Sequence, residues 1–271
     1  MDGGLSDKLS RMQASMQEMG SALVAYSGGI DSTLVLKVAH DVLGSQAVGV
    51  TAVSATFPDV ELDLARRVAG QIGARHLLVE TDQLTSPDFV RNDAGRCYHC
   101  KTDLYQGLSK LKGELDLKVM LDGTNLDDLG EDRPGITAAR EWGVRSPLLE
   151  AELSKNEVRI LARELDLSNW DKPAAACLSS LIPHGVAITR EKLSRVEEAE
   201  AALLREGFRQ FRVREQGDGA RIELDRAELP AMLHDGARQA RVAAQLKELG
   251  FRFVTVDPEG YRPGGANRNK P

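Results

Sequence analysis

The fold of this 271-residue chain is decided by one stretch, Ala22-Leu23-Val24-Ala25-Tyr26-Ser27-Gly28-Gly29-Ile30-Asp31-Ser32. An apolar run typical of a buried strand is followed at once by two glycines and then by a helical pattern. Glycines let the backbone turn sharply and bring its N–H groups close to an anion. The two serine hydroxyls add donors, and the helix start adds partial positive charge. The stretch therefore predicts a phosphate-binding loop.

This loop differs from two common phosphate-binding motifs. The Walker pattern ends in Gly-Lys-Ser/Thr, and the loop contains no Lys; Gly-x-Gly-x-x-Gly is also absent. The alternative interpretation is a plain glycine turn with Asp31 as a helix cap. Six matching positions between a strand and a helix favour the phosphate loop.

Strand-like and helix-like runs alternate along the chain on both sides of the loop. Alternation of this kind predicts the α/β class, with a parallel, doubly wound sheet that binds ligands at the carboxyl ends of its strands. The expected strands are residues 22–26, 47–53, 76–79 and 118–121, and the expected helices are residues 5–19, 32–43, 59–72, 98–111, 136–142 and 154–165.

The domain organisation follows from changes in pattern along the sequence. We expect a large α/β domain over residues 1–168 and an irregular connection over 169–189, which contains Cys177. A small α+β domain with the order α-β-β-α-β is expected over 190–257. The Gly- and Pro-rich tail, 258–271, is expected to be disordered.

Composition and charge exclude several classes of protein. The net charge is −6; residues 1–189 carry 19 basic and 27 acidic side chains, and residues 190–271 carry 16 and 14. An acidic large domain argues against a general polyanion-binding surface and favours a small substrate. Three cysteines, two of them in Cys97-Tyr98-His99-Cys100, suit metal or redox chemistry, so we expect a reducing, cytoplasmic location. The chain has no run of 18 apolar residues and no signal-peptide pattern, so no membrane partner is expected.

A second polar segment, Asp122-Gly123-Thr124-Asn125-Leu126-Asp127-Asp128, follows the expected strand 118–121. Carboxylate and amide oxygens at a strand end suit Mg²⁺ that is bound together with substrate phosphates. A solvated acidic turn is the alternative interpretation of this segment.

These motifs together resemble the PP-loop ATP pyrophosphatases, whose Ser-Gly-Gly-x-Asp-Ser loop binds the β- and γ-phosphates of ATP. The resemblance implies that ATP is split to AMP and pyrophosphate and that Mg²⁺ is required. It also implies a set of ATP-binding residues: Ser27, Gly28, Gly29, Asp31, Ser32, Ala52, Ser54, Gly123, Asn125 and Asp127.

Further motifs resemble one branch in particular, the LarE family of ATP-dependent sulfur transferases, over about residues 6–256. They are Cys-x-x-Cys-Lys at 97–101, Arg145-Ser146-Pro147-Leu148, Cys177-Leu178-Ser179-Ser180, Phe211-Arg212-Val213-Arg214 and Arg221-Ile222-Glu223. The family makes the thiocarboxylate groups of the nickel-pincer nucleotide cofactor. One departure is Leu181, where the family commonly has Arg.

The LarE resemblance implies roles for particular residues. Cys177, Asp31 and Glu223 would be catalytic, and Arg212 and Arg214 would bind the phosphate of a mononucleotide substrate. Glu200 and Glu223 would be metal ligands.

The source of sulfur has two forms compatible with the resemblance. In the catalytic form, Cys97, Cys100 and Cys177 bind a [4Fe-4S] cluster whose fourth iron lacks a protein ligand. In the sacrificial form, Cys177 gives up its own sulfur and becomes dehydroalanine. A zinc site completed by His99 is a further alternative. We expect the cluster, with the Cys-x-x-Cys pair on a loop.

Other functions remain open at the level of sequence. The same loop occurs in tRNA thiolases and in amide-forming synthetases, and a nucleotide-binding regulatory module without turnover would also contain it. The expected partners are a small mononucleotide and ATP in a homo-oligomer, without nucleic acid.

Overall fold

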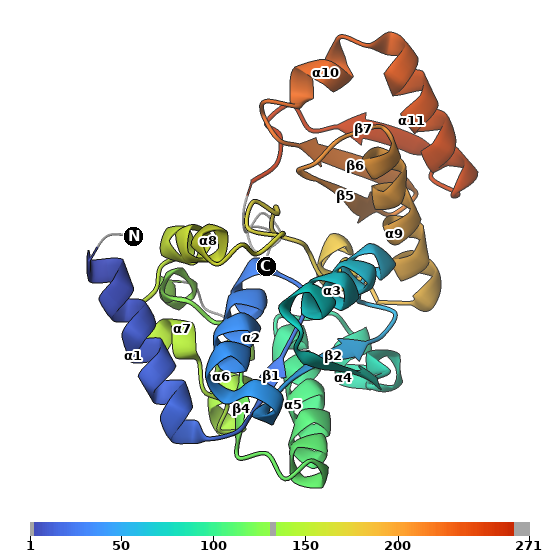
Figure 1. The fold of residues 1–271 in the computed structure, drawn as a ribbon. Helices are drawn as coiled ribbons and strands as arrows, with labels where there is room; N and C mark the ends of the chain where they lie inside the picture. The colour runs from blue at the N-terminus through green and yellow to red at the C-terminus, as the bar shows by residue number, and fades with distance from the viewer. Residues whose placement is uncertain (1–2, 131–133, 263–271) are drawn as a thin grey trace. The chain divides into compact units, whose positions relative to one another are not determined.

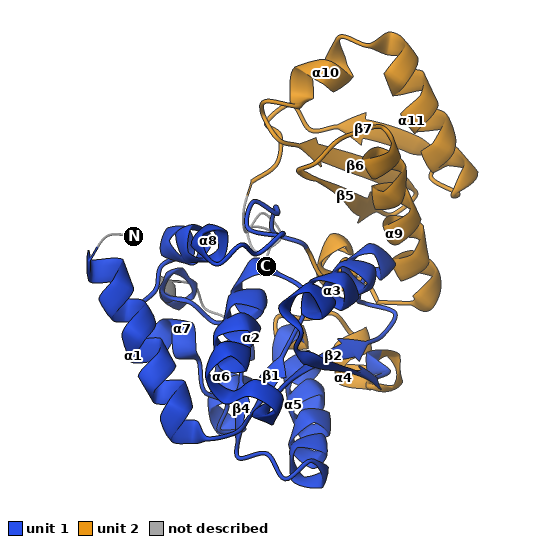
Figure 2. Ribbon diagram, viewed as in Figure 1, with its two compact units in different colours: residues 1–83, 97–175 blue, residues 84–96, 176–271 orange. Residues whose placement is uncertain are grey.

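The computed structural model describes residues 3–130 and 134–262, which form two compact units (Figures 1 and 2). Unit 1 comprises residues 1–83 and 97–175, and unit 2 comprises residues 84–96 and 176–271. None of the described helices combines the length and the apolar character needed to cross a membrane.

Unit 1 contains a four-stranded sheet that confirms the predicted fold class. Its strands are β1 (Ala22–Ala25), β2 (Ala47–Val53), β3 (Arg75–Glu80) and β4 (Val119–Leu121). They are all parallel, in the order β3-β2-β1-β4. The chain moves outward from β1 to β3 and then crosses to β4 on the other side of β1. The carboxyl ends of β1 and β4 therefore border a topological switch point, where ligands bind in open α/β sheets.

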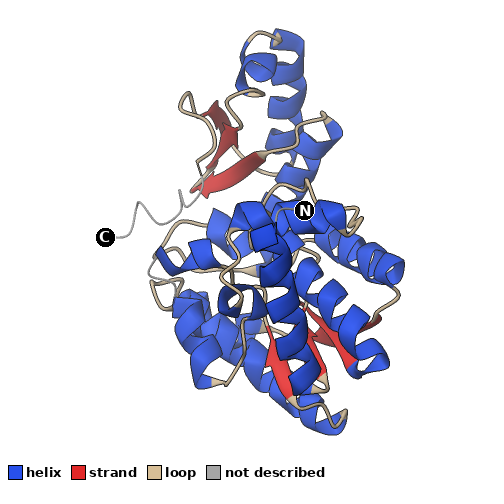
Figure 3. Cartoon of the chain, turned by 60° about the vertical axis from the view of Figure 1, so that its left-hand side comes forward, coloured by secondary structure: helices blue, strands red, loops and turns tan. Residues whose placement is uncertain are grey.

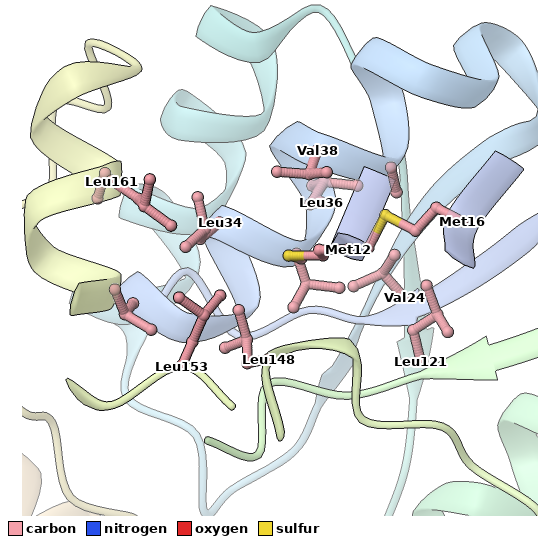
Figure 4. Packing of buried hydrophobic residues seen from close by; sticks show 14 of the residues in the cluster. Met12, Met16, Val24, Leu34, Leu36, Val38, Leu121, Leu148, Leu153 and Leu161 are labelled. Carbon is pink, nitrogen blue, oxygen red and sulfur yellow. The ribbon is translucent and has the colours of Figure 1, made fainter. Parts of the chain in front are cut away.

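Helices cover both faces of this sheet, because side chains alternate along its buried strands. Ala22 and Val24 of β1 belong to one apolar cluster, whereas Leu23 belongs to the other. The first cluster includes Met12 and Met16 from the helix expected over residues 5–19, so these methionines pack in the core (Figure 4). The helices are α1 (Gly3–Met19), α2 (Ile30–Leu43), α3 (Asp59–Ile72), α5 (Arg96–Glu114), α6 (Pro134–Glu141), α7 (Pro147–Glu150) and α8 (Lys155–Glu164).

Unit 2 contains a smaller mixed sheet with helices, and over residues 190–257 the order of elements differs from the predicted α-β-β-α-β by one additional short helix, α10, Leu229–Leu233 (Figure 3). Strand β5 (Phe211–Gln216) pairs antiparallel with β6 (Gly219–Leu224), and β6 pairs parallel with β7 (Phe253–Val256). The helices are α4 (Pro87–Val90), α9 (Arg190–Arg205), α10 (Leu229–Leu233) and α11 (Gly236–Glu248). The short helices α4, α7 and α10 have no periodic pattern long enough to be recognised in the sequence.

Residues 84–96 belong to unit 2 through contacts that the sequence does not reveal. The Asn92 side-chain amide donates to the carbonyls of Pro183 at 2.8 Å and Val186 at 3.0 Å. The Gly185 N–H donates to the Asn92 carbonyl. One buried asparagine thus joins two segments that are about 90 residues apart.

The tail is described only in part. Gly260 N–H donates to the Asp257 carbonyl, and Tyr261 N–H donates to the Leu224 carbonyl at 2.6 Å. Residues 258–262 are thus placed beside β6. The remainder of the tail, 263–271, lies outside the described residues.

Candidate functional site

The loop between β1 and α2 has the backbone geometry that its glycines predict. Gly28 has φ of +70°, and a Cβ atom there would lie 2.9 Å from the Cα of Ala65. Gly29 has φ of −71° and precedes α2, so it provides no capping side chain. The first N–H groups of α2 are left for an anion, as a phosphate loop requires.

Two serine hydroxyls close this loop from within. Ser27 Oγ and Ser32 Oγ are 3.1 Å apart, and Ser32 Oγ donates to the Gly29 carbonyl at 3.1 Å. The Gly29 N–H donates to Ser27 Oγ at 3.4 Å. The two serines therefore set the shape of the loop, and their hydroxyl groups can also donate to a phosphate.

The loop is also fixed by Asn169, a residue that the sequence analysis missed. This side chain is only 3% exposed, and its amide nitrogen donates to the Gly28 carbonyl at 3.0 Å and to Thr33 Oγ1 at 2.9 Å. Asn169 lies 141 positions from Gly28 in a stretch without periodicity. No local pattern could have identified it.

The segment after β4 meets the loop between β1 and α2. A Cβ atom at Gly123 would lie 2.8 Å from the Ser32 nitrogen, so only glycine allows the two segments to approach so closely. Asn125 Nδ2 donates to Asp31 Oδ1 at 3.2 Å. The switch point thus brings together Gly123, Asn125 and Asp31.

The acidic residues of this segment already have partners within the chain. Asp122 is buried and accepts from Ser146 Oγ at 2.7 Å and from Thr124 Oγ1 at 2.9 Å. Asp128 accepts from the Asn125 N–H, and Asp127 accepts from the Lys155 N–H at 2.6 Å. These bonds stabilise the segment and leave Asp127 beside the first residue of α8.

Lys155 provides the positive charge that the loop itself lacks. Its Nζ forms an ion pair with Asp31, which lies 124 positions away in the sequence. Ser154 and Glu157 form a capping box at the start of α8, which fixes the position of Lys155. The loop itself contains no lysine, and Lys155 is too far away in the sequence for a local motif to reveal it.

The side chains around Asp31 fit Mg²⁺ by the type of their donor atoms. Asp31, Asn125 and Asp127 offer oxygen atoms, the ligand type that Mg²⁺ prefers. No group of three or more His, Cys, Asp or Glu side chains is arranged to hold a metal ion within residues 3–130 and 134–262.

Ala52 and Ser54, which are expected to bind ATP, lie at the carboxyl end of β2. Ala52 is half-buried, and Ser54 Oγ lies 2.9 Å from Thr56 Oγ1 in the turn that follows. Nearby, Thr51 Oγ1 donates to the Tyr26 carbonyl and lies 2.8 Å from His76 Nε2.

Tyr26 and His76 are uncharged neighbours of this strand end. Burial, and to a smaller extent Arg66, lowers the pKa of His76, and burial raises the pKa of Tyr26 to about 12. Both side chains are therefore neutral near pH 7 and support the strand end without a charge.

Cys97 and Cys100 lie in the first turns of α5, so the prediction that they occupy a loop is wrong. The Arg96 N–H donates to the Asp93 carbonyl, and the helix begins at Arg96, ahead of both cysteines. Cys97 is exposed and Cys100 is half-buried, and neither of these unit 1 residues forms a disulfide within the described part of the chain.

Cys177 belongs to unit 2 and is an exposed free thiol just before the 3₁₀ turn η4 (Leu178–Leu181). Its Sγ lies 2.9 Å from Ser179 Oγ, and its carbonyl accepts from both the N–H and the hydroxyl of Ser180. Leu181, where the family commonly has Arg, is 1% exposed and packs in the core. The thiol is accessible on a fixed turn.

The charged residues predicted in unit 2 lie on β5, β6 and α9. Arg214 donates to Glu223 Oε1 at 2.8 Å and to the Ser180 carbonyl at 3.1 Å, which connects the sheet to the turn after Cys177. Arg212 is 9% exposed and its guanidinium lies 5.2 Å from the centre of the Tyr261 ring.

The two glutamates predicted as metal ligands have different partners. Glu200 Oε1 accepts from the Val213 N–H at 3.0 Å, at the free edge of β5. Glu223 Oε1 accepts from two arginines, Arg214 and Arg221.

Comparison with known proteins gives a family model described as asparagine synthase, which matches residues 9–129. An uncharacterized protein of Synechocystis sp. is 46% identical over 97% of this chain and 98% of its own length. The glutamine-hydrolyzing GMP synthase of Aeropyrum pernix is 26% identical over 74% of this chain and 43% of its own length.

A further relative carries a functional name. The pyridinium-3,5-bisthiocarboxylic acid mononucleotide synthase of Lactiplantibacillus plantarum is 39% identical over 97% of this chain and 95% of its own length. Such similarity extends through both units and far beyond the nucleotide-binding region that the asparagine synthase model matches. The chain therefore belongs to the LarE family of ATP-dependent sulfurtransferases, within the PP-loop ATP pyrophosphatases.

Proposed function

We propose that this enzyme uses ATP to adenylate a carboxylate of a pyridinium carboxylate mononucleotide and then converts it to a thiocarboxylate for nickel-pincer cofactor synthesis. The name of the Lactiplantibacillus relative supports this substrate class. The observation that carries the proposal is the meeting of the phosphate loop with Gly123, Asn125 and Lys155 around Asp31.

The first step is the transfer of AMP to the substrate. A carboxylate oxygen attacks the α-phosphorus of ATP, the bond to the bridging oxygen breaks, and pyrophosphate leaves with the electron pair. Ser27, Gly28, Gly29 and Ser32 bind the leaving β- and γ-phosphates through N–H and hydroxyl donors. Ala52 and Ser54 contact the adenine.

Asp31 has two roles in this proposal. Its carboxylate accepts from Asn125 and pairs with Lys155. Asp31 and Asp127 would hold Mg²⁺, and Lys155 would then neutralise phosphate charge. Mg²⁺ offsets the charge that develops on pyrophosphate.

Unit 2 carries the residues that we propose to bind the substrate phosphate. Arg212 and Arg214 bind the 5′-phosphate, because planar guanidinium groups donate paired hydrogen bonds to phosphate oxygens. Glu223, which accepts a hydrogen bond from Arg214, is the catalytic carboxylate. Glu223 and Glu200 are also proposed as metal ligands.

The sulfur atom replaces AMP in the second step. A sulfur nucleophile attacks the activated carbonyl carbon, and AMP leaves with the electron pair of the broken carbon–oxygen bond. Three thiolates, those of Cys97, Cys100 and Cys177, match the ligand set of a [4Fe-4S] cluster with one open iron. Such a cluster supplies sulfide when bound. None of the three cysteines forms a disulfide within the described residues, and Cys97 and Cys177 are exposed.

The alternative nucleophile is Cys177 itself. Its thiolate would attack the same carbon, and AMP would leave with the electron pair of the carbon–oxygen bond to give a thioester. Loss of the Cys177 Cα proton would then break the Cβ–sulfur bond. The products would be the thiocarboxylate and dehydroalanine at position 177, so each chain would act once.

The nucleotide site is tested with Asp31→Ala. We expect this variant to fold and to lose substrate-dependent AMP formation, because it removes the carboxylate at the centre of the site. Asp41→Ala, on the same helix and paired only at the surface with Lys37, is the matched control and should remain active. Normal AMP formation by Asp31→Ala would contradict the assignment.

The sulfur source is tested by anaerobic reconstitution with iron and sulfide. We expect about four irons per chain and several turnovers, both lost in Cys97→Ala and Cys100→Ala. If these variants keep full activity and Cys177 loses about 34 Da after turnover, the mass of H₂S, the sacrificial form is correct.

We also propose a cellular location, partners and an oligomeric state for the enzyme. Cysteines that form no disulfide within the described residues suit a reducing cytoplasm. ATP and a small mononucleotide are its partners, and we propose a homo-oligomer, which light scattering would test.

A further inference from the structure

One face of the small sheet in unit 2 presents charged side chains from two paired strands. Arg212 lies opposite Glu223, and Arg214 lies opposite Arg221, in the antiparallel register of β5 and β6. Residues two apart on a strand share a face, so all four project from the same side. The other side carries buried apolar residues such as Val213 and Ile222.

Two like charges directly opposite each other on a sheet repel, so the Arg214–Arg221 pair needs an explanation. One carboxylate oxygen joins the two groups: Glu223 Oε1 accepts from Arg214 Nε at 2.8 Å and from Arg221 Nη2 at 2.7 Å. A single oxygen thus holds two guanidinium groups side by side.

The donors of this pair exceed its acceptors. Arg221 Nε is buried and makes no hydrogen bond within the described part of the chain; it lies 3.9 Å from the carboxylate of Asp257, beyond hydrogen-bond distance. Arg221 Nη1 and Arg214 Nη2 also have no acceptor among the described residues. The side chains of Arg214 and Arg221 are only 12% and 29% exposed. Partly buried guanidinium groups with unused donors need an acceptor-rich ligand.

We propose that Arg221 is a direct ligand of the substrate phosphate and closes a clamp with Arg214 across the two strands. This inference rests on the proposed function, which assigns the phosphate to this face. A phosphomonoester dianion offers three terminal oxygens and two negative charges, which suits two adjacent guanidinium groups. Glu223 keeps the two guanidinium groups together.

The binding experiment uses two ligands that differ only in the phosphate: nicotinic acid mononucleotide and nicotinic acid riboside. Their affinities are measured by calorimetry for the full chain and for Arg221→Gln, Arg221→Lys, Arg214→Gln and Arg252→Gln. Arg252 is the matched control, since it lies in the same unit in an exposed pair with Asp218. Melting temperatures are recorded for every variant.

We expect Arg221→Gln to weaken mononucleotide binding by about 10- to 150-fold, the usual value of a charge-assisted hydrogen bond. Riboside binding should not change, Arg221→Lys should lie between the two, and Arg252→Gln should match the unaltered chain. A purely structural arginine would lower the affinities for both ligands together with the melting temperature, which would overturn the inference.

Failure of the inference and failure of the proposed function give different results. If Arg214→Gln loses the mononucleotide while Arg221→Gln binds it normally, the proposed function stands and the clamp is wrong. If the unaltered chain binds the mononucleotide and the riboside with equal affinity, the phosphate site itself is wrong.

Discussion

The two anion-binding sites that we propose, one in each unit, are built in different ways. The phosphate loop of unit 1 consists of backbone N–H groups and a helix start, fixed by Gly28, Asn169 and internal serine contacts. The arginine face of unit 2 consists of long side chains fixed by one carboxylate oxygen. The first site depends on backbone conformation, whereas the second depends on charge. Substitutions should therefore affect the two sites in different ways.

The largest effect is expected at Gly28. In Gly28→Ala the left-handed φ costs about 1–2 kcal/mol, and the new Cβ would lie 2.9 Å from Ala65. We expect complete loss of substrate-dependent AMP formation, measured by chromatography of the nucleotides.

Gly29→Ala is the control for this substitution. Gly29 has φ of −71°, and a Cβ atom there would meet only Ser27 Oγ, at 3.3 Å. Alanine can adopt this φ without strain, so AMP formation should persist at a reduced rate. Equal losses in the two variants would show that backbone conformation is not the decisive property.

A smaller effect is expected at Asn169, whose side-chain amide donates to the Gly28 carbonyl of the loop. Asn169→Ala leaves the Gly28 carbonyl and Thr33 Oγ1 without their shared donor, which costs about 1–3 kcal/mol of stability. We expect the KM for ATP to rise roughly 10-fold, about 1.4 kcal/mol, without a change in mononucleotide affinity.

The control for Asn169 is Asn156→Ala, an exposed position on α8. It should change neither stability nor KM. A loss of mononucleotide affinity in Asn169→Ala would mean that this residue does not act through the phosphate loop.

The sequence predicted the first site better than the second because the loop is a local feature. Residues 27–32 carry their own turn, donors and helix start, and the neighbouring strands follow an alternation that is visible along the chain. Asn169 and Lys155 could not be found this way, since each reaches the loop from more than 120 positions away.

The cysteines and arginines show a second limit of prediction from local sequence. Cys97 and Cys100 are predicted in a loop, yet α5 begins one residue earlier, because boundaries of helices depend on contacts beyond the pattern. Arg212 and Arg214 are readable as one strand face, but the position of Arg221 opposite Arg214 depends on strand register, which only the fold supplies.

The smallest effect is expected from the capping box that positions Lys155. Although burial opposes it, hydrogen bonds from Lys8 and Ser154 lower the pKa of Glu157 from 4.5 to about 2. A carboxylate with a lowered pKa stabilises the fold above its unfolded pKa, and that contribution is lost as the pH falls towards 2. Glu157→Gln should therefore be less stable than the unaltered chain at pH 7.

The pH dependence of that difference is the measurement. In urea titrations, the two stabilities should converge as the pH is lowered from about 5 towards 2, provided that the chain still folds there. A stability difference that stays constant over this range would show that the charge of Glu157 is not what stabilises the start of α8.

The central claim, ATP-dependent sulfur transfer to a mononucleotide, is tested most directly by counting products in one reaction. The reconstituted enzyme is incubated anaerobically with ATP, Mg²⁺, sulfide and a pyridinium carboxylate mononucleotide, and AMP and thiocarboxylate are quantified by mass spectrometry. We predict that AMP forms only with the mononucleotide present and in proportion to the sulfur-containing product. AMP formation that needs no mononucleotide, or a product without sulfur, would contradict the account.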